Sequence, residues 1–148
     1  MTAKSTITLN EAEIRQLIAD QQSAICAKDV DQIMSHYATE VIIFDVKPPF
    51  QIKGKGAFRQ VWEECLPYFP DSFEIETRDL NITVSDNLAV AHWLSHFTAM
   101  EPHHPAMQTW MRITAVCQRN QGEWQILHQH ISVPFNPQTS QAVFTLNP

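Results

Sequence analysis

An acidic residue directly follows the most strand-like run of this chain. Residues 41–44 read Val-Ile-Ile-Phe, four apolar side chains with a strong preference for β-structure, and Asp45 comes next. A carboxylate at the end of a buried strand can act as a general base in a pocket, or it can cap the turn that Pro48-Pro49 introduces. The choice between these two roles largely decides what the protein does.

Several other side chains could contribute to a pocket beside that carboxylate. Tyr37 ends a short amphipathic pattern, and its hydroxyl could reach the rim of a pocket. Gln21 falls in an apolar helical stripe where the period expects an apolar residue, so it could donate a hydrogen bond inward. Trp62 and Trp110 belong to the core or form the wall of an apolar pocket.

A cation alternates with a tryptophan and a threonine on one predicted strand. Arg112 shares a strand face with Trp110 and Thr114. If that face is concave, the arginine needs an anion, which could be Asp45 or a carboxylate of the substrate. If it is the outer face, Arg112 contributes to a contact between two subunits.

Two histidines share one face of the next strand. In-register pairing across the turn at Gly122 places His128 and His130 on the face opposite Arg112, and a β-bulge would reverse this arrangement. We therefore expect either the arginine or the two histidines to face the pocket. Histidines in a half-buried pocket could transfer protons, whereas on the outer face they would form hydrogen bonds in a subunit interface.

No metal or cofactor is expected. A His-x-His pair binds a metal only when a third ligand converges on it, and the other local pair, His103-His104, lies in a proline-flanked segment. The three cysteines are widely spaced and odd in number, which favours free thiols in a reducing compartment such as the cytoplasm. The chain has three glycines and no phosphate-loop or dinucleotide fingerprint.

The composition is that of one globular domain. The chain has 148 residues, of which 44% are hydrophobic and 18% charged, and its formal net charge is −6. An acidic chain is a poor partner for a nucleic-acid backbone. No apolar run approaches the roughly 18 residues that a membrane span needs.

The pattern along the chain predicts helices first and strands afterwards. Capping boxes at Asn10 and Asp29 begin two helices, and a third helix follows Gly54 and ends before Pro67. Strands are predicted over 41–46, 73–84, 88–100, 107–119 and 124–134, with tails over 1–9 and 136–148. This order indicates an α+β domain over 10–135, with helices on one face of an antiparallel sheet.

The second face of this sheet is not clearly polar. In 88–100 and in 107–119, residues of both parities are substantially apolar. We therefore expect a symmetric homodimer that forms through the outer sheet face.

Three segments within 10–135 resemble the nuclear transport factor 2-like (cystatin-like) superfamily. Residues 37–45 are similar to the ketosteroid isomerase pattern Tyr-Ala-x-x-Ala-x-Val-x-Asp, and residues 54–59 are similar to the common Gly-x-x-Ala-Ile-Arg start of the third helix. Residues 110–114 together with the Gly-x-Trp-x-x-x-His-x-His-x-Ser run of 122–134 resemble the SnoaL-like subgroup and the association domain of calcium/calmodulin-dependent kinase II.

The resemblance implies a cone-shaped domain of three N-terminal helices packed on a curved, mainly antiparallel sheet. It places Asp45 at the position of the isomerase's catalytic base. Counting without gaps places Gln21 at one oxyanion-donor position and Thr114 near the other, and neither is an acidic donor.

Two functional hypotheses follow. The first is a protein that binds a small apolar or carboxylated molecule in its cone. It could be a cofactor-independent isomerase, cyclase or dehydratase with Asp45 as base and Tyr37, Gln21 or His130 polarising a carbonyl. The second is a non-catalytic ligand-binding or oligomerisation module that resembles the kinase association domain.

Overall fold

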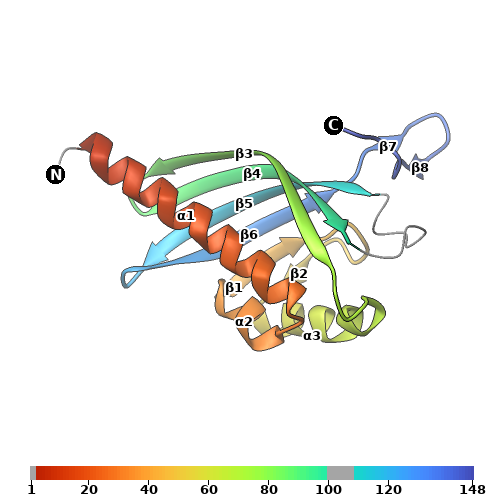
Figure 1. Cartoon of the computed structure of the whole chain (residues 1–148), viewed down its shortest axis with the longest axis horizontal. Helices are drawn as coiled ribbons and strands as arrows, with labels where there is room; N and C mark the ends of the chain where they lie inside the picture. Colours follow the sequence, from red (N-terminus) through yellow and green to blue (C-terminus); the bar gives the residue numbers. More distant parts are fainter. Residues whose placement is uncertain (1–2, 100–108) are drawn as a thin grey trace.

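Three helices cover one face of a six-stranded sheet (Figure 1). The computed structural model describes residues 3–99 and 109–148. The helices are α1 (Ala3–Cys26), α2 (Val30–Ser35) and α3 (Lys55–Cys65), and the last continues into the 3-10 turn η1 (Leu66–Tyr68). The strands of the sheet are β1 (Tyr37–Phe44), β2 (Ile52–Lys53), β3 (Glu74–Ser85), β4 (Leu88–Thr98), β5 (Trp110–Asn120) and β6 (Glu123–Ser132). This is the predicted α+β fold.

The sheet is antiparallel except at one junction. Its order is β2-β1-β6-β5-β4-β3, and only β1 and β6 run parallel. Helix α1 crosses the sheet diagonally, while α2 and α3 lie together at one end of it (Figure 1). The helices and the curved sheet enclose a cone, with the apolar core between them.

Helix α1 begins earlier than the capping box predicted. It starts at Ala3, so the prediction that residues 3–9 form a tail and that Asn10 caps the helix is wrong. Asn10 is 4% exposed, and its Oδ1 accepts a hydrogen bond from Arg119 Nη1 at 3.0 Å. Glu13 accepts from Trp124 Nε1 at 2.8 Å. The polar residues of the predicted box therefore attach the helix to the sheet.

The second predicted N-cap is confirmed, but the reciprocal bond of a capping box is not made, because the Asp29 amide donates to the Ala24 carbonyl oxygen at 3.0 Å. Asp29 is the N-cap of α2, and its Oδ1 accepts from the Gln32 amide at 3.2 Å. The strand that follows begins at Tyr37, four residues before the predicted start at Val41. Tyr37 therefore belongs to β1 and not to the helix, and its fully buried ring packs edge-on against Phe58 of α3 at 5.0 Å.

The C-terminal segment is not a plain tail. Residues 136–148 take part in a small hairpin formed by β7 (Phe135–Asn136) and β8 (Gln141–Ala142), which pair antiparallel outside the main sheet. No helix in the described part of the chain is long and apolar enough to cross a membrane.

Candidate functional site

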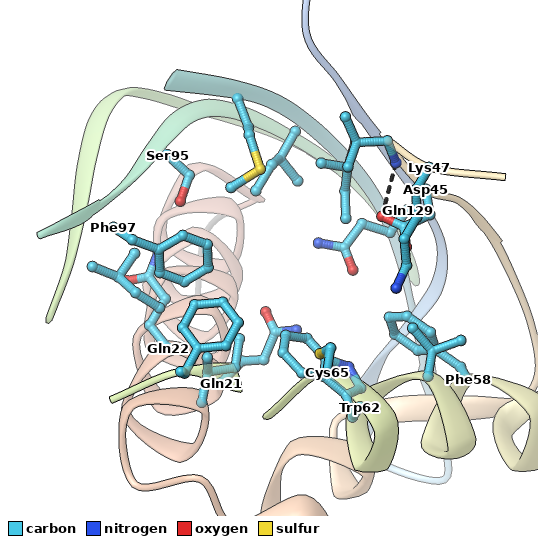
Figure 2. A pocket seen from close by; sticks show the side chains of 18 of the residues that line it. Gln21, Gln22, Asp45, Lys47, Phe58, Trp62, Cys65, Ser95, Phe97 and Gln129 are labelled. Atoms are coloured by element: carbon cyan, nitrogen blue, oxygen red, sulfur yellow. Dashed lines mark hydrogen bonds between the residues drawn. The ribbon is translucent and has the colours of Figure 1, made fainter. Parts of the chain in front are cut away.

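A cavity of about 210 Å³ lies between the helices and the concave face of the sheet (Figure 2). Helices α1 and α3 and the strands β1, β3, β4, β5 and β6 contribute to its wall, which is mostly apolar. Its apolar lining includes Phe58, Trp62, Phe69, Trp93, Phe97 and Ile131. Trp62, predicted as a wall residue, lies here with its ring edge-on to Phe58 at 6.0 Å.

Three buried polar side chains meet at one wall of this cavity. Tyr37 is 0% exposed, and Gln21 and Gln129 are 3% and 4% exposed. Gln21 Nε2 donates to the Tyr37 hydroxyl, which in turn donates to Gln129 Oε1 at 2.7 Å. The three come from α1, β1 and β6, so this polar trio links the long helix to the parallel strand pair.

Tyr37 organises this trio and is poorly suited to be an acid. Burial raises the pKa of Tyr37 far above its usual range, and the hydrogen bond from Gln21 opposes that shift. The hydroxyl therefore stays protonated, and its single proton is committed to Gln129. The structure thus places two predicted residues, Gln21 and Tyr37, at the cavity wall and in contact with each other.

Asp45 lies at the opening of the cavity. It continues the inward parity of Val41 and Ile43 and lines both the cavity and an open groove outside it. Its side chain is part-buried, and Oδ1 accepts from the Val46 amide at 2.8 Å. Within residues 3–99 and 109–148 it has no cationic partner closer than 4 Å. The turn bond is the contact that a capping role predicts, but it leaves the second carboxylate oxygen uncommitted.

A β-bulge decides which residues of β6 face the cavity. Cys117 pairs with Ile126, but its neighbour Val116 pairs with His128, so Leu127 has no partner on β5. The extra residue reverses the parity of the strand beyond it. As a result Gln129, opposite Ala115, faces inward.

The expectation that either Arg112 or the two histidines face the pocket is therefore wrong. His130 pairs with Thr114, and Arg112 pairs with Ser132, so all of them share the outer face. The bulge brings the histidines to the same side as Arg112 and does not move the arginine inward. Arg112 consequently cannot hold Asp45 or a substrate carboxylate inside the cone.

The outer-face residues have partners of their own. Arg112 Nε donates to Ser132 Oγ at 3.1 Å, and Trp110 stacks on His96 with ring centroids 4.7 Å apart. His128 Nδ1 donates to the Ile42 carbonyl oxygen at 2.6 Å. His130 lies edge-on to Phe44 and lines only the outer groove.

Two buried polar residues of the cavity wall, Gln129 and Ser95, were not predicted from the sequence. Figure 2 shows the Gln129 amide directed into the cavity and the Ser95 hydroxyl on the far side. The alternation of residues along 88–100 could have identified Ser95 as inward-facing, because it shares the buried strand face with Ala91 and Trp93. Gln129 had no such signal, because its orientation depends on the bulge at Leu127.

No metal centre is found in the described residues. Among residues 3–99 and 109–148, no group of three His, Cys, Asp or Glu side chains is placed to hold a metal ion. The pair His103-His104 lies outside the described residues.

Helices closed over a curved sheet, with a cavity between them, define a domain of the nuclear transport factor 2-like, cystatin-like fold. The sequence model of the SnoaL-like domain matches residues 14–136. The chain therefore belongs to the SnoaL-like domain family. Among curated proteins, none matches it.

Solved structures agree with this assignment. A nuclear transport factor 2-like protein of unknown function from Pseudomonas putida is 34% identical, with a TM-score of 0.87 over 95% of this chain and 98% of that one. A Streptomyces avermitilis protein provisionally named a dehydratase is 12% identical, with a TM-score of 0.71 over 84% and 96%. A Parabacteroides distasonis protein provisionally named a ketosteroid isomerase is 20% identical, with a TM-score of 0.63 over 78% and 83%. The last two likenesses show the fold alone.

Proposed function

We propose that this protein binds a small, uncharged and mainly apolar molecule in the cone. The apolar lining supports this, and so does the charge distribution, because Lys47 is the one cation among the described lining residues. Arg112, the cation that the sequence offered as a partner for a carboxylated ligand, lies on the outer face. A buried carboxylate without a cation is costly, which favours an uncharged ligand.

The volume restricts the size of the ligand. A cavity of about 150 Å³ holds one benzene molecule. The 210 Å³ available here therefore suits one or two fused rings, with more of a ligand reaching out through the opening. A four-ring steroid would extend out of this volume through the opening, which directs the search first to smaller substrates.

We further propose that Asp45 acts as a general base in a cofactor-independent isomerisation or dehydration. The observation that carries this proposal is a carboxylate that lies at the opening of an apolar cavity and has no cationic partner among residues 3–99 and 109–148. Asp45 would take a proton from the carbon beside a carbonyl, and the electron pair would move to the carbonyl oxygen. Gln129 has uncommitted amide hydrogens that can stabilise the developing negative charge. Solved structures of the same fold that are provisionally named a dehydratase and a ketosteroid isomerase make this class of reaction the one to test first.

The test does not require the natural substrate. Exchange of the α-hydrogens of 1-indanone with D₂O can be followed by NMR, because each exchange reports one proton transfer next to a carbonyl. We expect the wild-type protein to accelerate this exchange by about a hundredfold or more over buffer. Asp45→Asn should return the rate to that of buffer and leave 1-indanone binding intact.

Asp71→Asn is the matched control, because Asp71 is exposed and does not line the cavity. It should exchange like the wild type. Bound 1-indanone that exchanges no faster than in buffer would contradict the base role and favour the alternative, a non-catalytic ligand-binding module. A large loss of stability in Asp45→Asn would assign the carboxylate to the turn.

We also propose that the protein is a cytoplasmic homodimer that pairs through its outer sheet face. Exposed apolar side chains on this face, including Val90 and Phe44, lie among the outward-facing polar residues and support a protein contact there. Sedimentation equilibrium should give twice the mass of the chain, and Val90→Lys should give the monomer mass. A monomeric wild type at micromolar concentration would contradict this proposal.

A further inference from the structure

A tyrosine hydroxyl between two buried amides constrains both of them. Tyr37 has one hydroxyl proton, so it can donate to one glutamine and must accept from the other. Here it donates to the Gln129 oxygen and accepts from the Gln21 nitrogen. The two amides are thereby held with opposite polarity toward the hydroxyl.

The constraint also fixes the groups that the amides present to the cavity. Gln129 keeps both of its amide hydrogens, while Gln21 keeps its carbonyl oxygen and one amide hydrogen, and no further side-chain hydrogen bond engages either amide within the described residues. Figure 2 shows both amides directed into the cavity. Exchanging the two roles of Tyr37 would reverse which glutamine donates but would still leave one donor and one acceptor.

We propose that Tyr37 is a positioning residue that makes the cone selective for an uncharged group with a hydrogen-bond acceptor beside a donor, such as a hydroxy-ketone, an enolised diketone or a lactam. This inference rests on the proposed ligand-binding function and specifies the chemistry of the ligand. The acceptor receives a hydrogen bond from one glutamine, and the donor is matched to the oxygen of the other. A ligand that offers only one of the two leaves a buried amide group unpaired.

The fixed position of the trio explains why selectivity would reside here. Gln21, Tyr37 and Gln129 are all at least 96% buried and lie on three different elements, so no single element can move one of them freely. Ser95, the other buried polar residue in the wall, has a hydroxyl that rotates and so accepts either polarity. It adds little discrimination.

Three bicyclic probes of nearly equal shape test the proposal. Isoindolin-1-one is a lactam with an acceptor and a donor, phthalide is the lactone with the acceptor alone, and indane has neither. Calorimetry on the wild type should give a Kd for the lactam about tenfold lower than for the lactone, since one unpaired buried group costs about that much. In Tyr37→Phe this ratio should fall to within about threefold of one, while the Kd of indane stays unchanged.

Tyr68→Phe is the matched control, because Tyr68 is the other tyrosine of the chain and is 83% exposed. It should keep the wild-type ratio. Should Tyr37→Phe not yield folded protein, Gln129→Met removes one side of the pair at similar volume and should reduce the ratio in the same way.

The outcomes separate this inference from the proposed function. Probes that bind with a ratio that Tyr37→Phe does not change would overturn the positioning role and leave the ligand-binding function intact. If none of the three binds the wild type at millimolar concentration, the proposed function fails, and this inference fails with it. A lactam preference that disappears only in Tyr37→Phe or Gln129→Met establishes it.

Discussion

The buried polar trio predicts an unusual pattern of stabilities. Tyr37→Phe removes a fully buried hydroxyl and keeps the ring that packs against Phe58. The change leaves Gln21 and Gln129 each without one hydrogen-bond partner at a buried site. An unsatisfied buried polar group costs about 1–3 kcal/mol, and the open cavity softens that cost, so we expect a loss of about 2 kcal/mol in the free energy of unfolding.

Replacing all three residues of the trio should lower the free energy of unfolding less than Tyr37→Phe alone. In the variant with Gln21→Leu, Tyr37→Phe and Gln129→Leu, none of these three positions carries an unpaired polar group. Replacing all partners by apolar groups of similar shape is nearly neutral, so this triple variant should unfold within about 1 kcal/mol of the wild type. Tyr68→Phe, at an exposed site, should change stability by no more than about 0.5 kcal/mol.

Urea unfolding followed by tryptophan fluorescence measures all four proteins. The comparison is valid where the slope of free energy against urea is the same, because the two-state analysis then applies. The reasoning is refuted if the triple variant loses as much as Tyr37→Phe or more. It is equally refuted if Tyr37→Phe is as stable as Tyr68→Phe.

Three further predictions concern other buried groups. Burial raises the pKa of Cys117 to about 12, so this thiol should react with a disulfide reagent only on unfolding. Cys65 lies in the cavity wall, so its thiol should react in the folded protein, and bound indane should protect it. Timed labelling followed by mass spectrometry distinguishes the two thiols. Burial lowers the pKa of His36 in the folded protein below its usual 6.5. The unfolded chain therefore binds a proton at His36 at a higher pH than the folded protein does. The free energy of unfolding that is present above pH 6.5 is consequently lost as the pH falls below this value. His36→Gln should therefore flatten the fall in urea midpoint between about pH 7.5 and about pH 5.5, and an unchanged fall would contradict this. Asn10→Ala should lower the free energy of unfolding in urea by about 1 kcal/mol, because Arg119 Nη1 loses its acceptor while Arg119 Nε keeps Asn87, and a neutral result would contradict the anchoring role.

Most of the fold could be predicted from local pattern. The alternation in 88–100 and the turn at 120–123 identified the long antiparallel strands, and a side chain that caps its own helix identified Asp29. The start of α1 could not be predicted in this way. Asn10 and Glu13 have the types and the spacing of a cap, but their partners are Arg119 and Trp124, more than a hundred residues away.

The residues of the candidate site also differ in whether a local pattern or a distant partner determines their position. Gln21 and Asp45 could be placed because each depends on a single helical or strand period within its own element. The inward face of β6 depends on one unpaired residue, Leu127, which carries no local signal and moves His128 and His130 out of the cone and Gln129 into it. The hydrogen bonds of Tyr37 join three distant elements, so periodicity could suggest its burial but not its partners.

A crystal structure of the protein soaked with isoindolin-1-one tests the central claim most directly. We predict the lactam inside the cone, with its polar edge on Gln21 and Gln129 and its open side toward Asp45. A lactam found only in the outer groove beside Phe50 and His130, with the cone unoccupied in the same crystal, would contradict the assignment of the cone as the functional site.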